Sequence, residues 1–324
     1  MDVVALGELL IDFACLDTDG DGYPTMAAHP GGAPCNFLAA LSKYGAKTAF
    51  LGKVGEDAFG ALLRRTLERS GIDTRGLVTD PSVFTTLAFV TFDARGDRSF
   101  SFARKPGADI RLKREELDLS LIDQARVFHF GTLSLTDEPA RAATRAAVAY
   151  ARERGKCITF DPNLRKPLWF SLEQARTEIL WGLSQADVVK ISEDEVDFLW
   201  SCGPEEGARR LLEEHGVSLA MVTLGSEGCL LANAGGCVRV RGPRVTPVDT
   251  TGAGDIFGGS AVSRLLELGK EPAALNREEL LYVARFAVTA ASLSTQVPGG
   301  IPSIPDRAAV ERAMQTLEEQ PAGR

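Results

Sequence analysis

The chain has 324 residues, of which 44% are apolar and 25% charged, an ordinary composition for a soluble globular protein. Its 36 basic and 44 acidic residues give a net charge of −8, which argues against nucleic acid as a default partner. No apolar run approaches the ~20 residues of a membrane span. No basic leader precedes the first strand-like run, and the six cysteines form no C-x-x-C pair. We therefore expect no membrane partner, reduced thiols and a cytoplasmic location.

The N-terminal pattern predicts a buried strand over residues 3–10, with Asp12 just beyond its end. Ligands of parallel α/β sheets gather outside the carboxyl ends of the strands, so Asp12 is either a ligand-binding carboxylate or a turn residue. Gly32 can bring bare backbone close to a ligand. A helix is predicted over residues 36–44, and the Asn36 amide in its first turn either reaches the same ligand or lies on the surface.

The alternation of predicted strands and helices is interrupted near residue 86. β-prone runs at residues 86–92 and 99–102 flank a polar stretch at 93–97, which predicts a β-hairpin. Phe102 and Arg104 share a face of this hairpin because residues two apart in a strand point the same way. Arg104 is by default a solvated surface charge.

The rest of the chain alternates between strand and helix patterns, which predicts an α/β protein. The predicted strands cover residues 48–54, 126–130, 157–160, 187–191, 219–223, 229–232 and 237–240. The predicted helices cover residues 58–69, 136–154 and 280–293.

The stretch from 249 to 259 joins a polar, glycine-punctuated loop to an apolar pattern at helical spacing. Gly252, Ala253 and Gly254 should form the first helical turn, where free N–H groups and the helix dipole make an anion site. Asp255 lies beside this site and could take the proton of an alcohol while the N–H groups hold a migrating phosphoryl group. A capped structural helix is the alternative, and the local pattern leaves both open.

Two motifs together resemble the signatures of the PfkB (ribokinase-like) sugar kinases. Residues 249–255 are similar to the C-terminal signature, and residues 31–36 followed by 52–60 are similar to the N-terminal one. The motifs occur in the expected order, and the similarity runs from residue 3 to about residue 305. Three further stretches resemble the fructokinase branch of the family, at residues 104–109, 129–135 and 161–169.

The resemblance implies a ribokinase-like three-layer α/β/α fold with a mainly parallel sheet and a small β-lid. The lid would be formed by about residues 12–32 and 86–105, within one kinase domain over residues 1–318, and a polar tail would follow at 319–324. Lid-to-lid pairing in a homodimer is the expected assembly, because such a lid exposes an apolar face. ATP, Mg²⁺ and, at a monovalent-cation site, K⁺ are the implied cosubstrate and ions.

The resemblance also assigns roles to individual residues. It makes Asp255 the base and Gly252, Ala253 and Gly254 the anion hole. The substrate side would comprise Asp12, Gly32, Asn36, Phe102, Arg104 and Arg165. The ATP side would comprise Asn163, Ser192, Thr223, Gly225, Ser226 and Gly228. Glu195 would contact Mg²⁺ through a water molecule. The backbone of Asp249 and Thr251 would bind the monovalent cation.

Some of these roles have open alternatives. Ser192 stands where the family commonly has the Asn of Asn-x-x-Glu, so its role is undefined. Glu195 could instead belong to an acidic first turn that stabilises the helix dipole. Arg165 could be a surface ion pair.

D-Fructose is the leading substrate, phosphorylated to fructose 6-phosphate, because of the fructokinase-like stretches. 2-Keto-3-deoxygluconate is second, since Arg104 and Arg165 could bind its carboxylate. The alternative from another class is a catalytically silent sugar-binding or regulatory protein on the same fold. The chain has no G-x-x-x-x-G-K-[ST], which excludes a Walker-type kinase.

Overall fold

The computed structural model describes residues 1–92 and 98–318. Within them, ten strands form one large sheet with the order β14-β13-β12-β11-β10-β9-β1-β4-β5, and β6 also pairs with β4. The pairings of β13 are antiparallel and the others are parallel. The strands are β1 (Val3–Leu6), β4 (Thr48–Gly55), β5 (Ile72–Asp73), β6 (Leu77–Asp80), β9 (Val127–Gly131), β10 (Cys157–Asp161), β11 (Val188–Ser192), β12 (Leu219–Thr223), β13 (Cys229–Asn233) and β14 (Gly236–Val240).

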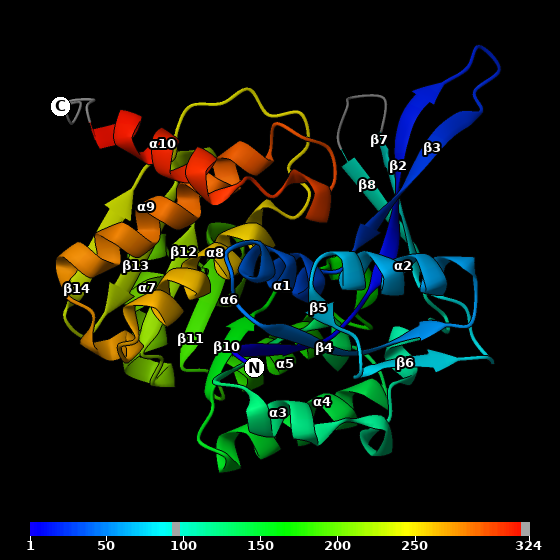
Figure 1. The fold of residues 1–324 in the computed structure, drawn as a ribbon, viewed down its shortest axis with the longest axis horizontal. Coiled ribbons are helices and arrows are strands. Elements are labelled where there is room, and N and C mark those ends of the chain that lie inside the picture. The colour runs from blue at the N-terminus through cyan, green and yellow to red at the C-terminus, as the bar shows by residue number, and fades with distance from the viewer. Residues whose placement is uncertain (93–97, 319–324) are drawn as a thin grey trace.

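Helices cover both faces of this sheet (Figure 1). One layer contains α1 (Ala33–Lys43), α2 (Ala58–Arg69), α8 (Ala253–Leu268), α9 (Arg277–Ser294) and α10 (Arg307–Glu318). The other contains α3 (Leu119–Gln124), α4 (Ala140–Glu153), α5 (Leu172–Leu183), α6 (Glu193–Trp200) and α7 (Pro204–His215). Short 3-10 turns cover Asp109–Arg111, Arg114–Glu116, Leu133–Leu135, Lys166–Leu168, Gly225–Glu227, Pro272–Ala274 and Ile301–Ser303.

The strands read as continuous apolar runs because both of their faces are buried. Val3 and Ala5 of β1 face the first helical layer, whereas Val4 and Leu6 face the second. Successive side chains of a strand point to opposite faces, and a parallel sheet with helices on both sides buries each set. The predicted three-layer arrangement with a mainly parallel sheet is confirmed.

A second, four-stranded sheet has the order β3-β2-β7-β8 and projects from the body at the upper right of Figure 1. Its strands are β2 (Leu10–Thr18), β3 (Pro24–Gly31), β7 (Leu87–Phe92) and β8 (Arg98–Ala103). This sheet contains most of the two segments expected to form a lid, and we refer to it below as the lid. The polar hairpin loop expected at residues 93–97 and the polar tail expected at 319–324 lie outside the described residues.

The predicted boundaries depart most from the structure at two places, and the helices expected from residues 36 and 280 begin three residues earlier, at Ala33 and Arg277. The strand expected over residues 3–10 is two strands, since β1 ends at Leu6 and β2 begins at Leu10 in the lid. The residues on both sides of this junction are buried, so the sequence shows one apolar run and gives no sign that the strand ends. The helix expected from residue 136 begins at Ala140 instead. Pro139 restricts the residue before it and has no N–H to donate, so the helix starts after it.

In the described part of the chain, no helix combines the length and the apolarity needed to cross a membrane.

Candidate active site

A cavity of ≈ 1140 Å³ lies where the carboxyl ends of the parallel strands meet the lid and the start of α8. This is the edge of an open α/β sheet at which ligands bind. Of the predicted site residues, those lining the cavity are Asp12, Gly32, Asn36, Phe102, Asn163, Arg165, Ser192, Glu195, Thr223, Gly225, Thr251, Gly252, Gly254 and Asp255. Ala253, Arg104, Ser226, Gly228 and Asp249 are not among the lining residues.

Asp255 lies in the first turn of α8, whose N-cap residue is Gly252 with φ of 76°. The Asn36 side chain on α1 donates a hydrogen bond from Nδ2 to Asp255 Oδ2 over 2.9 Å. The pKa of Asp255 is raised above its ordinary value because burial is the largest effect. The Asn36 hydrogen bond and the charges of Lys190 and Arg165 act in the opposite direction. A carboxylate is thus held beside the N-terminal turn of α8, in which the Ala253 N–H donates to the Thr250 carbonyl over 3.3 Å.

The lid side of the cavity carries a second carboxylate, Asp12. Burial raises the pKa of Asp12 to about 6, against the opposing charge of Arg165. Arg165 is exposed to the cavity and also acts on Asp255, so one guanidinium lies near both carboxylates. Two carboxylates and an arginine around one space suit a ligand with several hydroxyl groups.

Arg104, which was expected to contact substrate, is not among the residues that line the cavity. Arg104 is 4% exposed, and its guanidinium group donates to Asp109 Oδ2 over 2.8 Å, to Thr136 Oγ1 over 2.9 Å and to the Leu133 carbonyl over 2.8 Å. A buried arginine needs such partners because its charge has left water. Arg104 instead ties the end of β8 to the body of the protein.

Ser192 and Glu195 form a capping box at the start of α6. Ser192 Oγ accepts from the Glu195 N–H over 3.3 Å, and Glu195 Oε2 accepts from the Ser192 N–H over 2.8 Å. Glu195 Oε1 accepts from the Leu164 N–H over 2.7 Å, which fixes the loop after β10. Serine therefore supplies here the N-cap that asparagine also provides.

The turn after β12 divides the remaining residues of the predicted ATP side. Thr223 and Gly225 line the cavity, but Ser226 and Gly228 do not. Gly228 has φ of 103°, and a Cβ there would collide with the Val240 carbonyl oxygen. This glycine serves the packing of the turn on β14.

The loop before α8 is braced by the Asp249 side chain. Its Oδ1 accepts from the Thr251 N–H over 2.9 Å and from Thr251 Oγ1 over 2.7 Å. Its Oδ2 accepts from the Gly299 N–H over 2.8 Å, which joins this loop to the segment after α9. The carboxylate is engaged within the protein, so a cation here would have to meet backbone oxygens.

Sequence reasoning missed Lys190, which also lines the cavity. Lys190 lies on β11, is 8% exposed, and places Nζ 3.1 Å from Asp161 Oδ2. The signal was available: a single lysine stands inside the otherwise apolar run of β11, and lysine is almost never fully buried unless paired.

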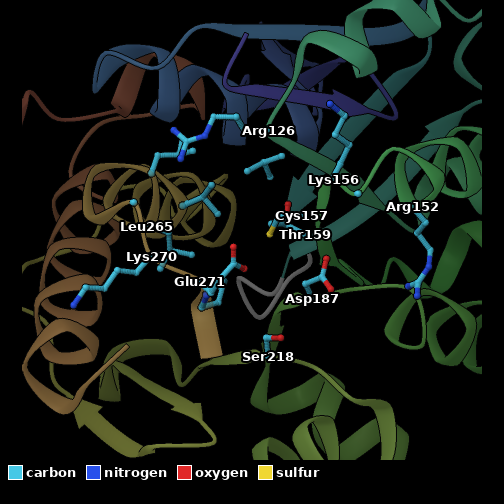
Figure 2. Close-up of a pocket in the computed structure, with 16 residues that line it drawn as sticks. Arg126, Arg152, Lys156, Cys157, Thr159, Asp187, Ser218, Leu265, Lys270 and Glu271 are labelled. Carbon is cyan, nitrogen blue, oxygen red and sulfur yellow. The ribbon is translucent and has the colours of Figure 1, made fainter. Parts of the chain in front are cut away.

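A second cavity of ≈ 460 Å³ lies at the opposite edge of the sheet. Val127 and Cys157 in its lining begin β9 and β10, so it lies at the amino ends of the strands. Figure 2 shows Asp187 and Glu271 near Cys157, with basic side chains farther out. Burial raises the pKa of the Cys157 thiol to about 12, and both carboxylates add to this shift. The thiol is therefore protonated at neutral pH.

The fold and the site define a sugar-kinase class, and the family comparison agrees with it. The model of the pfkB family of carbohydrate kinases matches residues 1–307, so the chain belongs to that family. Fructokinase-1 of Zea mays is 41% identical over 321 residues, covering 98% of each chain. Probable fructokinase-6, chloroplastic, of Arabidopsis thaliana is 41% identical over 318 residues, covering 96% of this chain and 82% of the relative.

Solved structures agree with the fold. A fructokinase with bound ATP from Xylella fastidiosa has a TM-score of 0.90 at 29% identity, covering 98% of this chain and 99% of its own. A putative ribokinase II from E. coli in complex with ATP and Mg²⁺ has a TM-score of 0.86 at 28% identity, covering 97% and 99%. A double-mutant fructokinase from Vibrio cholerae O395 with fructose, ADP and potassium ion has a TM-score of 0.84 at 32% identity, covering 97% and 98%. The predicted ribokinase-like fold is confirmed.

Proposed function

We propose that this carbohydrate kinase transfers the γ-phosphoryl group of ATP to the primary hydroxyl of D-fructose and forms fructose 6-phosphate. The observation that carries the proposal is the half-buried Asp255 carboxylate beside the N-terminal turn of α8, within a cavity that also holds Asp12 and Arg165. Support for fructose comes from the relatives named fructokinases, which match nearly the whole chain.

The chemistry follows from the positions of these groups. Asp255 takes the hydroxyl proton as the sugar oxygen bonds to the γ-phosphorus. The bond from that phosphorus to the bridging oxygen breaks, and ADP leaves with the electron pair. The N–H groups of Gly252 and Gly254, which line the cavity, hold the charge of the phosphoryl group during transfer, whereas the Ala253 N–H donates to the Thr250 carbonyl. Asn36 keeps Asp255 oriented through its 2.9 Å hydrogen bond.

The ions remain part of the proposal. No group of three or more His, Cys, Asp or Glu in the described residues could hold a metal by itself. Mg²⁺ usually keeps several waters and binds substrate phosphates, so Glu195 at the cavity is proposed to contact a hydrated Mg²⁺ through water. When bound, this ion would neutralise phosphate charge. Backbone oxygens at Asp249 and Thr251 are proposed for K⁺, an ion found in one related structure.

Fructose is favoured over 2-keto-3-deoxygluconate by the position of Arg104. The keto acid was considered because two arginines could hold its carboxylate, but Arg104 is buried against Asp109. Arg165 is the member of that pair that remains at the cavity.

The test is ATP-dependent phosphorylation across fructose, 2-keto-3-deoxygluconate, ribose, tagatose, fructose 6-phosphate and adenosine. We expect a preference for fructose of about tenfold or more in kcat/KM, equivalent to ~1.4 kcal/mol. Preference for the keto acid would reassign the substrate and keep the mechanism. Sugar binding without turnover on any acceptor would favour the silent sugar-binding protein.

We also propose a homodimer formed through the lid. Leu16 on β2 and Tyr23 beside β3 are 66% and 71% exposed, so the lid presents apolar surface for pairing. Light scattering coupled to size exclusion tests this, and a monomer at micromolar concentration would contradict it. The six free cysteines fit a reducing compartment, for which we propose the cytoplasm, although the name of one relative includes chloroplastic.

A further inference from the structure

We propose that Lys190 is a further catalytic residue of this kinase. Its ammonium group would bind an oxygen of the migrating phosphoryl group, next to the N–H groups of Gly252 and Gly254, and Asp161 would be the residue that positions it. The inference rests on the proposed function and adds a charged donor to the anion hole.

The first support is the contact between Lys190 and Gly254. A Cβ built on Gly254 would lie 2.9 Å from Lys190 Nζ and 3.4 Å from its Cε. The ammonium group therefore lies directly against the turn whose N–H groups form the anion hole. A glycine at this position leaves room for the lysine head.

The second support is the charge that Lys190 keeps although it is buried. Burial lowers the pKa of Lys190, but the carboxylates of Asp161, Glu195 and Asp255 raise it, and the net shift is upward. An ammonium group among three carboxylates at a cavity is suited to an incoming phosphate, since its charge offsets their repulsion.

The third support comes from comparison with Lys53, another buried lysine of the same sheet. Lys53 is 3% exposed, and its Nζ donates to Glu116 over 2.7 Å, to the Arg111 carbonyl over 3.1 Å and to Asp80 over 3.3 Å. These acceptors match the three N–H donors of an ammonium group. Lys53 does not line either cavity described above.

Lys190 differs from Lys53 in how many of its donors are used. Among the described residues, the hydrogen bond of its Nζ goes to the Asp161 carboxylate, at 3.4 Å from Oδ1 and 3.1 Å from Oδ2. At least one N–H is left for a ligand, and Lys190 lines the active-site cavity. The pairing of Lys53 is structural, whereas that of Lys190 is incomplete at the place where charge develops.

The bond changes are those of the proposed reaction, and Lys190 adds none to them. Lys190 forms and breaks no covalent bond and gives up no proton, while the sugar proton goes to Asp255. Lys190 stabilises the negative charge on the phosphoryl oxygens, and Asp161 prevents the lysine head from moving away. Removing one such electrostatic donor typically costs ~10²–10³ in kcat.

The experiment compares Lys190→Met and Lys190→Gln with Lys53→Met as the matched control. For each variant, kcat and the sugar KM are measured with fructose. The affinities for ADP and for a non-hydrolysable ATP analogue are measured by calorimetry without sugar. Thermal melting reports folding. The ratio of the affinity for the ATP analogue to the affinity for ADP reports on the γ-phosphate, which ADP lacks. A lysine with a merely structural role would leave this affinity ratio unchanged.

For both Lys190 variants we expect kcat to fall ~10²–10³-fold with a sugar KM within about threefold of wild type. The preference for the ATP analogue over ADP should fall by about tenfold or more, as for a lost charged hydrogen bond. Lys53→Met should melt earlier, with kcat and the affinity ratio within about twofold.

A folded Lys190 variant with kcat and affinity ratio within about threefold of wild type would overturn the proposal. A Lys53→Met variant that loses as much kcat and as much of the affinity ratio as the Lys190 variants would also overturn it. If wild type turns over no acceptor, the proposed function fails and the affinity ratio alone decides about Lys190. A reduced ratio would support the contact, and an unchanged ratio would refute it.

Discussion

Gly252→Ala is the substitution that most directly disturbs the geometry of the proposed anion hole. Gly252 is the N-cap of α8 with φ of 76°, a region that L-residues other than glycine rarely enter. A Cβ there would lie 2.9 Å from Gly300 Cα and 3.1 Å from Asn36 Nδ2. The added methyl group thus meets backbone on one side and, on the other, the amide that orients Asp255.

The expected effect has two parts. The left-handed conformation costs an alanine ~1–2 kcal/mol, which lowers stability. Relief of the close contacts must move the turn or Asn36 by several tenths of an ångström, which displaces N–H donors and the base together. Misplacing such groups costs about 10²-fold or more in kcat.

Gly269→Ala is the matched control, at the other end of the same helix. Gly269 also has a positive φ, of 63°, but apart from its neighbours in the chain no atom of the described residues lies within 4 Å of the Cβ that alanine would add. This variant should lose similar stability and retain kcat within about twofold. The assay is steady-state phosphorylation of fructose with ATP, with urea unfolding of each variant alongside.

Either of two results would refute this reasoning. Gly252→Ala could fold and keep kcat within about threefold of wild type, so that the turn would not hold the phosphoryl group. Alternatively, Gly269→Ala could lose as much activity as Gly252→Ala, so that helix stability alone would govern catalysis.

Two more predictions concern the walls of the cavity. Arg165→Ala should lower kcat/KM for the sugar ~10–100-fold, as expected for one lost charged hydrogen bond. The affinity for ATP should stay within about threefold of wild type. A change in ATP affinity alone would contradict the assignment of Arg165 to the sugar. Burial raises the pKa of Glu8 from 4.5 to about 7, so its contribution to stability is full below pH 4.5 and is lost as pH rises through 7. Glu8→Gln can keep the oxygen that accepts from the Ala33 N–H and should be more stable than wild type at pH 8 by up to ~3 kcal/mol, with little difference at pH 4.5. Urea unfolding at both pH values measures this, and an unchanged difference between them would refute it.

The sequence could predict those parts of the site that are encoded locally. The turn at Gly252 and Gly254, with Asp255 behind it, is a short loop followed by helical periodicity, and α8 begins there as expected. Its contact with Asn36 joins residues far apart in the chain, so only the folded structure reveals the 2.9 Å hydrogen bond.

Arg104 and Lys190 show what local pattern could not predict. Arg104 ends a polar-looking hairpin, yet Asp109 and the Leu133 carbonyl enclose it, because the connection after β8 folds back on the body. Lys190 reads as a single interruption of a strand, and its partner Asp161 lies on the neighbouring strand β10. In both cases, tertiary pairing decides whether a charge is structural or available to a ligand.

The central claim is that Asp255 is the base of an ATP-dependent fructose kinase, and Asp255→Asn tests it most directly. The rate of fructose 6-phosphate formation is compared between wild type and this variant, with ATP affinity measured separately. The asparagine can still hydrogen bond near Asn36 but cannot take a proton, so we expect the rate to fall ~10²–10⁴-fold while ATP affinity stays within about threefold. Wild-type turnover of fructose with a variant rate within about tenfold of it would contradict the claim.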